Sequence, residues 1–162
     1  MTVARQRGKR HAPALVASLA VFAALLGAAS AQQWTEAVDP NTGLALSGFD
    51  PVAYFTEHMP RFGRSDLELT ADGVVWRFEN PGNRAAFAAH AEIYRPGFEG
   101  YDPVALARGA SVPGHPLIWA IVGERLYLFY SDAARRDFLS DPGRVIALAE
   151  RKWTKLAQAA LP

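Results

Sequence analysis

Residues 118–130 read Ile118-Trp119-Ala120-Ile121-Val122-Gly123-Glu124-Arg125-Leu126-Tyr127-Leu128-Phe129-Tyr130. Two apolar runs of strand length flank Gly123-Glu124, and glycine at the first position of a two-residue loop favours a β-hairpin with a type II′ turn. Both runs are apolar at nearly every residue. We therefore expect this hairpin to lie centrally in a sheet and to be covered on both faces.

A second hairpin is predicted earlier in the chain. Apolar and polar residues alternate over residues 67–71 and again over residues 74–78, with Asp72-Gly73 between them. Alternation on both sides of an Asp-Gly dipeptide is the strongest short-range signal for a hairpin. The sequence therefore predicts two hairpins.

Four helices are expected around these hairpins, each from a capping residue or a proline at its start. They begin at Asn80-Pro81, Asp102-Pro103, Ser131 and Asp141-Pro142. The helix from Asn80 is expected to reach about His90, and the second helix is expected to end before Gly109. The last helix carries an apolar stripe of Val145, Ala149, Trp153, Leu156 and Ala160. We expect Trp119, Tyr127 and Trp153 to share one core.

Hairpins interleaved with helices predict an α+β domain, a small antiparallel sheet of two hairpins packed by helices. We identify no internal repeat. The predicted organisation is a signal peptide over residues 1–31, an extended N-terminal segment over residues 32–46 and a single domain over residues 47–160.

The first 31 residues have the order of a signal peptide: basic residues from Arg5 to Arg10, an apolar run from Ala14 to about Ala28, and Ala29-Ser30-Ala31 as a cleavage site. An uncleaved anchor is the alternative, although the apolar run is shorter than the roughly 20 residues that span a bilayer. We expect a periplasmic or secreted protein without stable membrane insertion.

Removing the signal peptide also changes the charge of the chain. It leaves 13 basic and 16 acidic residues, a net charge of −3, and the remaining basic residues are interspersed with acidic ones. This pattern does not favour nucleic acid as a partner. The chain has no cysteine, so disulfides cannot contribute to the stability of the exported protein.

Residues 48–55 read Gly-Phe-Asp-Pro-Val-Ala-Tyr-Phe, and residues 76–96 contain an aromatic strand, a helix and a Phe-x6-Tyr ending. Together with Gly100-Tyr101 and the second hairpin, these segments resemble the secreted, extended branch of the YHS domain family over roughly residues 47–156. The resemblance implies a small exported domain of α+β fold that binds a ligand or serves as an accessory protein.

Metal-associated members of that family carry cysteines at the positions of Ala53, Glu79 and Asn83 in this sequence. The secreted branch commonly has Tyr-Cys where this chain has Tyr101-Asp102. Because all these sulfurs are missing, thiolate binding of soft metals is not implied here.

Four residues at family-like positions are our candidates for contact with a small ligand: Asp50, Tyr54, Tyr101 and Asp102. Aromatic rings with a carboxylate suit a small organic or cationic group. The alternative is that the aspartates cap turns and the tyrosines only pack.

Histidines offer a second chemistry. His58, His90 and His115 could hold copper or zinc together with carboxylates, although none of them has the spacing of a known ligand motif. For His90 we favour a half-buried histidine on its helix. No nucleophile with a base at motif distance is present.

We therefore expect a non-enzymatic domain that binds a small molecule or a protein partner and needs no cofactor, with O/N-ligated metal handling as the alternative function. A hydrolase whose residues converge only in space is a third, less favoured class.

Overall fold

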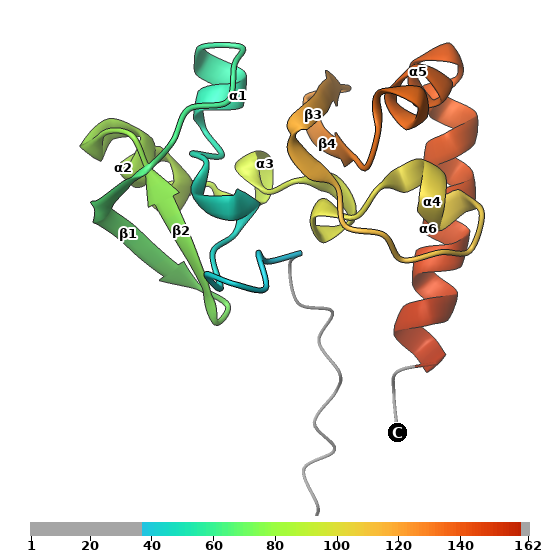
Figure 1. The fold of residues 1–162 in the computed structure, drawn as a ribbon, viewed down its shortest axis with the longest axis horizontal. Coiled ribbons are helices and arrows are strands. Elements are labelled where there is room, and N and C mark those ends of the chain that lie inside the picture. The colour runs from blue at the N-terminus through green and yellow to red at the C-terminus, as the bar shows by residue number, and fades with distance from the viewer. Residues whose placement is uncertain (1–36, 160–162) are drawn as a thin grey trace, which may run out of the picture.

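The computed structural model describes residues 37–159, and the predicted signal peptide, residues 32–36 and Ala160 lie outside this range (Figure 1). Short 3-10 helices are η1 (Leu46–Gly48) and η2 (Gly97–Gly100). The strands are β1 (Arg64–Ala71), β2 (Val74–Phe78), β3 (His115–Val122) and β4 (Arg125–Phe129). The α-helices are α1 (Ala53–Thr56), α2 (Pro81–Ala89), α3 (Ala91–Tyr94), α4 (Pro103–Ala107), α5 (Asp132–Ser140) and α6 (Pro142–Ala159).

The predicted α+β class is confirmed: two antiparallel two-stranded sheets are packed by helices. Local signals placed the four predicted helices, because the side chain of the residue before each start accepts a hydrogen bond from a backbone N–H of the first turn; α1 and α3 have no such cap and were not predicted. The Asn80 side chain accepts the Asn83 N–H at 2.9 Å, and the Ser131 hydroxyl accepts the Ala134 N–H at 3.2 Å.

Both hairpin turns have two residues with positive φ. The values are 51° and 79° for Asp72 and Gly73, and 58° and 59° for Gly123 and Glu124. Positive φ at both central residues defines type I′. The type II′ turn predicted at Gly123-Glu124 is therefore wrong, because Glu124 also takes the left-handed conformation.

The two hairpins form separate sheets, β1-β2 and β3-β4, so the second hairpin is not the centre of one larger sheet. Its two faces are nevertheless both covered. Leu126 and Leu128 belong to a first hydrophobic cluster with Trp76 and Phe78, whereas Tyr127 and Phe129 belong to a second cluster. The β3-β4 hairpin thus separates two hydrophobic cores and contacts one with each face, which explains why nearly all of its residues are apolar.

Trp119, Tyr127 and Trp153 do not share one core, contrary to our prediction. Trp119 packs against the first cluster and Tyr127 lies in the second. Adjacent strands place these two residues on opposite faces, since Trp119 pairs with Leu128 rather than with Tyr127. Trp153 is half-buried on α6, where its ring lies 6.3 Å from Phe98.

The chain contains an internal repeat, which the sequence reading missed. The segment Gly48-Phe49-Asp50-Pro51-Val52-Ala53 returns as Gly100-Tyr101-Asp102-Pro103-Val104-Ala105, and each copy is followed by a hairpin and a helix. We call residues 46–89 the first unit and residues 98–140 the second unit. Figure 1 shows β1, β2 and α2 on one side of the molecule, with β3, β4 and α5 on the other.

The two units share detailed geometry as well as sequence. Gly63 N–H donates to Gly48 O at 2.9 Å, and Gly114 N–H donates to Gly100 O at 2.8 Å. Each first strand has a register shift near its start. Each helix inserts one buried phenylalanine against its own hairpin, with ring centroids 4.7 Å apart for Phe87 and Trp76 and 5.0 Å apart for Phe138 and Tyr127.

Two further elements complete the described chain. Residues 38–45 form a turn closed by a bridge between Val38 and Ala45, in place of a fully extended segment. Helix α6 packs on α4, with Val145 and Ala149 buried. Within residues 37–159 we find no helix with the length and hydrophobicity needed to cross a membrane.

Candidate functional site

Asp50, a predicted ligand contact, is buried, and its carboxylate is occupied by the protein itself. Oδ1 accepts the Val52 N–H at 2.8 Å, and Oδ2 accepts the Glu79 N–H at 2.8 Å and the Asn83 side-chain amide at 2.7 Å. This carboxylate ties the 50–52 turn to the end of β2 and the start of α2.

Asp102 does the same in the second unit. Its Oδ1 accepts N–H groups of Val104 and Ala105 at 2.7 and 3.2 Å, and its Oδ2 accepts the Tyr130 N–H at 2.9 Å. Buried carboxylates with this many backbone donors hold a fold together.

The two predicted tyrosines occupy different surroundings. Tyr54 is buried, donates its hydroxyl to Pro116 O at 3.0 Å and packs edge-on against Trp119. Burial, reinforced by the nearby charge of Asp50, raises the pKa of Tyr54 above its ordinary value. Tyr101 is half-buried with its ring 5.8 Å from Trp153.

The three histidines do not come together as a metal site. His58 is exposed in a loop at φ 54°. His90 has a side chain 62% exposed and lies 3.6 Å from Glu92, so the half-buried position that we predicted for it is wrong. Its backbone leaves the helical conformation at the end of α2, which turns the ring outward. Across the described part of the chain, no group of three or more His, Asp or Glu side chains could hold a metal ion.

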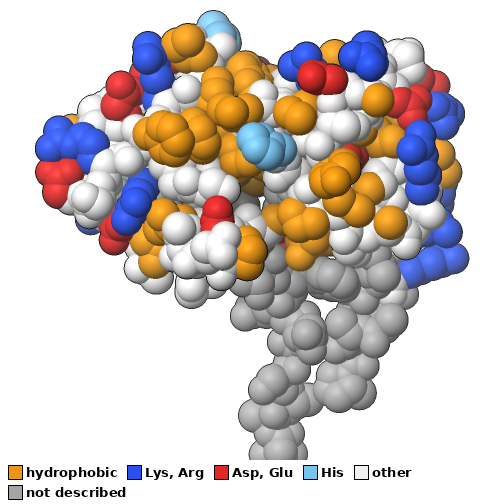
Figure 2. Space-filling model, in the orientation of Figure 1, with side chains coloured by type: hydrophobic (Ala, Val, Ile, Leu, Met, Phe, Trp, Pro, Cys, Tyr) orange, Lys and Arg blue, Asp and Glu red, His pale blue; other side chains and the backbone are white. Residues whose placement is uncertain are grey.

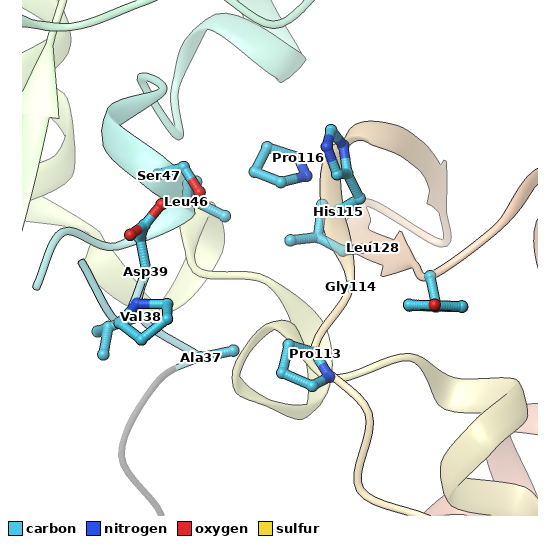
Figure 3. A pocket seen from close by; sticks show the side chains of 12 residues that line it. Ala37, Val38, Asp39, Leu46, Ser47, Pro113, Gly114, His115, Pro116 and Leu128 are labelled. Atoms are coloured by element: carbon cyan, nitrogen blue, oxygen red, sulfur yellow. The ribbon is translucent and has the colours of Figure 1, made fainter. Parts of the chain in front are cut away.

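A hollow of about 270 Å³ opens between the N-terminal turn and the start of β3 (Figure 3). None of Asp50, Tyr54, Tyr101 or Asp102 lines it. The lining residues come from residues 37–47 and from the second unit: Ala37, Val38, Asp39, Pro40, Leu46, Ser47, Pro113, Gly114, His115, Pro116, Leu128 and Tyr130. Of the predicted candidates, only His115 is among them.

One wall of the hollow carries a carboxylate. Asp39 Oδ1 accepts the N–H groups of Asn41 and Thr42 at 2.8 and 3.2 Å, and the Ser47 hydroxyl lies near this carboxylate. The Asn41 N–H above all, with smaller contributions from Thr42 and Ser47, lowers the pKa of Asp39 below its ordinary value. Asp39 is therefore ionised at neutral pH.

The opposite wall carries an imidazole, as Figure 3 shows for His115 beside Pro116. His115 Nδ1 accepts the Leu117 N–H at 3.1 Å. A backbone N–H can only donate, so the ring proton must be on Nε2. His115 is thus an exposed side chain with a hydrogen-bond donor at its free end.

Ser47, His115 and Asp39 are the residue types of a hydrolytic triad, but their hydrogen bonds differ from those of a triad. The Ser47 hydroxyl lies near the Asp39 carboxylate. His115 carries its proton on Nε2 and so cannot accept a proton from a serine there. With these hydrogen bonds His115 is not placed as the base of Ser47.

Sequence reasoning missed Asp39, Ser47 and Tyr130. Asp39-Pro40 lies in the segment that we expected to be extended, and an aspartate in a turn normally bonds to its own backbone. The positive φ of Ser47, 50°, had no signal in the sequence. Tyr130 read as the last residue of a strand.

Figure 2 shows that hydrophobic side chains gather around a histidine in the middle of one face, with lysines and arginines mostly near the edges. Exposed patches of this kind are often binding surfaces.

Comparison of the chain with known protein families, with characterised proteins and with solved structures gave no match. The resemblance to YHS domains therefore stays a prediction, and the internal repeat provides the only comparison between related segments.

Proposed function

We propose that this protein is an exported, non-enzymatic YHS-like domain that binds a small molecule in the hollow between residues 37–47 and the start of β3. Export follows from the signal-peptide order of residues 1–31. The YHS-like build rests on the Gly-x-Asp-Pro-Val segment, which the chain carries twice.

The observation that carries the proposal is the difference between the two units at the hollow. His115 takes the place of Arg64, since each is the first residue of its strand and pairs with the last residue of the next strand. Tyr130 takes the place of Glu79, since each N–H donates to the buried aspartate of its unit.

The first unit shows that this backbone accepts charged residues at both positions. Arg64 is exposed and pairs with Asp66. At the same places the second unit presents an imidazole and a phenol, and Tyr130 is 68% exposed. An aromatic ring in water at a position that accepts glutamate is not needed for folding, so a binding role accounts for it.

Native mass spectrometry of the protein purified from its own compartment tests this proposal. We expect a small-molecule adduct on the wild type and its loss in Pro113→Trp, because a larger side chain at the rim fills the hollow. The matched control is Phe62→Trp, which changes the equivalent position of the first unit. An adduct that persists in Pro113→Trp, or a wild type without any adduct, would contradict the proposal.

A protein partner is the second candidate, favoured by large apolar side chains on the surface. Phe62 is 70% exposed and Leu117 is 54% exposed, in addition to Tyr130. A photo-crosslinking residue at position 62 or 117 should then give one adduct of defined mass in the native compartment. Copper or zinc has no comparable support from the side chains of residues 37–159.

A further inference from the structure

The hollow has one formal charge and no basic residue to balance it. Asp39 is the only acidic residue among the twelve that line it, and none of the twelve is lysine or arginine. Among the ion pairs of the described residues, none includes Asp39. Its hydrogen bonds come from neutral groups. A cationic group on a ligand would therefore gain attraction here without displacing a protein cation.

The wall that faces Asp39 favours a hydrogen-bond acceptor on the ligand. With Nδ1 bonded to the Leu117 N–H, the free end of His115 is an N–H donor. A donor is satisfied by a carbonyl or carboxylate oxygen. Figure 3 shows Asp39 and Ser47 on one side of the hollow, with His115 and Pro116 on the other.

Beside these polar groups, apolar side chains contribute the larger share of the lining. Pro40, Pro113 and Pro116 contribute rings, and Val38, Leu46 and Leu128 contribute aliphatic surface. The volume of about 270 Å³ lies just below the range of roughly 300–1,000 Å³ typical of drug-sized ligands. The occupant is therefore of metabolite size, with a compact apolar body.

We infer that the hollow takes a small zwitterion of the amino-acid type, with its ammonium group on Asp39, its carboxylate on the His115 Nε2–H and its apolar body against the prolines and Tyr130. This inference rests on the proposed function, because it names the ligand class of the same site. An organic anion would place its charge near Asp39 without compensation, and a neutral molecule would gain no attraction from the charge of this carboxylate.

Three probes with one branched body separate the contributions of the two charged groups, which an amino acid carries on the same carbon: L-leucine, 3-methylbutan-1-amine and 4-methylpentanoate. Amide chemical shifts of Ser47 and Leu117 in the full exported chain report binding at the two walls. We expect L-leucine to bind most tightly, the amine about tenfold more weakly and the acid more weakly still.

Two substitutions each remove the binding group of one wall, the charge of Asp39 or the Nε2–H donor of His115. Both retain an acceptor for the local backbone N–H. Asp39→Asn retains an oxygen for the Asn41 N–H but loses the charge. It should weaken L-leucine and the amine about tenfold and leave the acid unchanged or improved. His115→Asn can still accept the Leu117 N–H but lacks the distal donor, so it should weaken L-leucine and the acid and spare the amine.

The matched controls remove the same chemical groups at residues that do not line the hollow. Asp66→Asn removes an exposed carboxylate of the first unit, and His58→Asn replaces an exposed histidine at a positive φ that asparagine tolerates. Both should leave all three affinities unchanged.

The outcomes separate this inference from the proposed function. If the acid or a neutral analogue such as 4-methylpentanamide binds best, or if Asp39→Asn leaves L-leucine binding intact, the zwitterion assignment is overturned while the hollow remains a binding site. If none of the four probes shifts Ser47 or Leu117, the zwitterion assignment is also overturned, and loss of the adduct in Pro113→Trp then decides whether the hollow binds another class.

Discussion

Replacing Asp102 with asparagine tests whether the repeated turn is held by its buried carboxylate. The substitution keeps the shape of the side chain and removes one acceptor oxygen. In either orientation of the amide, its NH₂ group faces a backbone N–H, of Tyr130 on one side or of Val104 on the other. One hydrogen bond is lost, and a donor is left against a donor.

The expected cost follows from these contacts. A hydrogen bond to a charged group contributes about 1.5–3 kcal/mol, and the bonds that remain become weaker because the acceptor is neutral. We expect Asp102→Asn to lower the free energy of unfolding by about 2–4 kcal/mol. Urea denaturation followed by tryptophan fluorescence measures this, with an unchanged m-value as the check on two-state unfolding.

The repeat supplies an internal replicate. Asp50→Asn should cost about as much as Asp102→Asn, because each carboxylate accepts three hydrogen bonds. Asp66→Asn, on the exposed surface, should leave the unfolding midpoint unchanged. A cost below about 0.5 kcal/mol for Asp102→Asn would refute the structural role of the carboxylate.

Three further predictions concern stability. Trp153→Ala should cost about 1–2.5 kcal/mol in urea denaturation, less than the 3–5 kcal/mol of a fully buried tryptophan, because this ring is half-buried. Tyr54→Phe should cost about 1–2 kcal/mol by the same assay, since Pro116 O loses its buried donor. The hydrogen bond with Glu57 raises the pKa of Glu79, whereas the hydrogen bond with Arg61 lowers the pKa of Glu57. The contribution of Glu79 to the free energy of unfolding is therefore complete at low pH and is lost as pH rises through its raised pKa. The contribution of Glu57 is present at higher pH and is lost as pH falls through its lowered pKa. As pH rises through the raised pKa of Glu79, the unfolding midpoint of wild type should fall relative to Glu79→Gln, whose amide donates at every pH; parallel profiles would contradict this.

Elements with a local signal could be predicted from the sequence. Asn80-Pro81 and Asp141-Pro142 open helices because the capping side chain bonds to a backbone N–H within the next turn, and Asp72-Gly73 forms a hairpin because both residues accept positive φ. Such contacts span three residues or fewer, so a short stretch of sequence specifies them.

The core arrangement could not be predicted in the same way. The apolar hairpin at residues 118–130 was correctly expected to be covered on both faces, but two separate clusters cover it. Continuous hydrophobicity shows that a strand is buried without showing what buries it. The same ambiguity placed Trp119 and Tyr127 in one core, although pairing between strands puts them on opposite faces.

The repeat was missed because most equivalent positions of the two units have a similar degree of burial but carry different residues. Trp76 corresponds to Tyr127 and Phe78 to Phe129, all four buried and aromatic. The surface residues diverged further, since nothing in the shared backbone constrains them. Only the turn around each aspartate retained its sequence, because its hydrogen bonds need that carboxylate.

This divergence shows where function should be sought in the chain. Residues that both units share, such as Asp50 and Asp102, are explained by the hydrogen bonds that hold each turn, so the repeat itself argues against a ligand role for them. Exposed positions that differ are free of that constraint. At one end of the second unit, His115 and Tyr130 replace charged residues of the first and line one hollow with Asp39, which lies in a turn before the first unit and has no counterpart in the second. Selection for folding alone gives no reason for these changes to fall around one hollow, whereas selection for binding does.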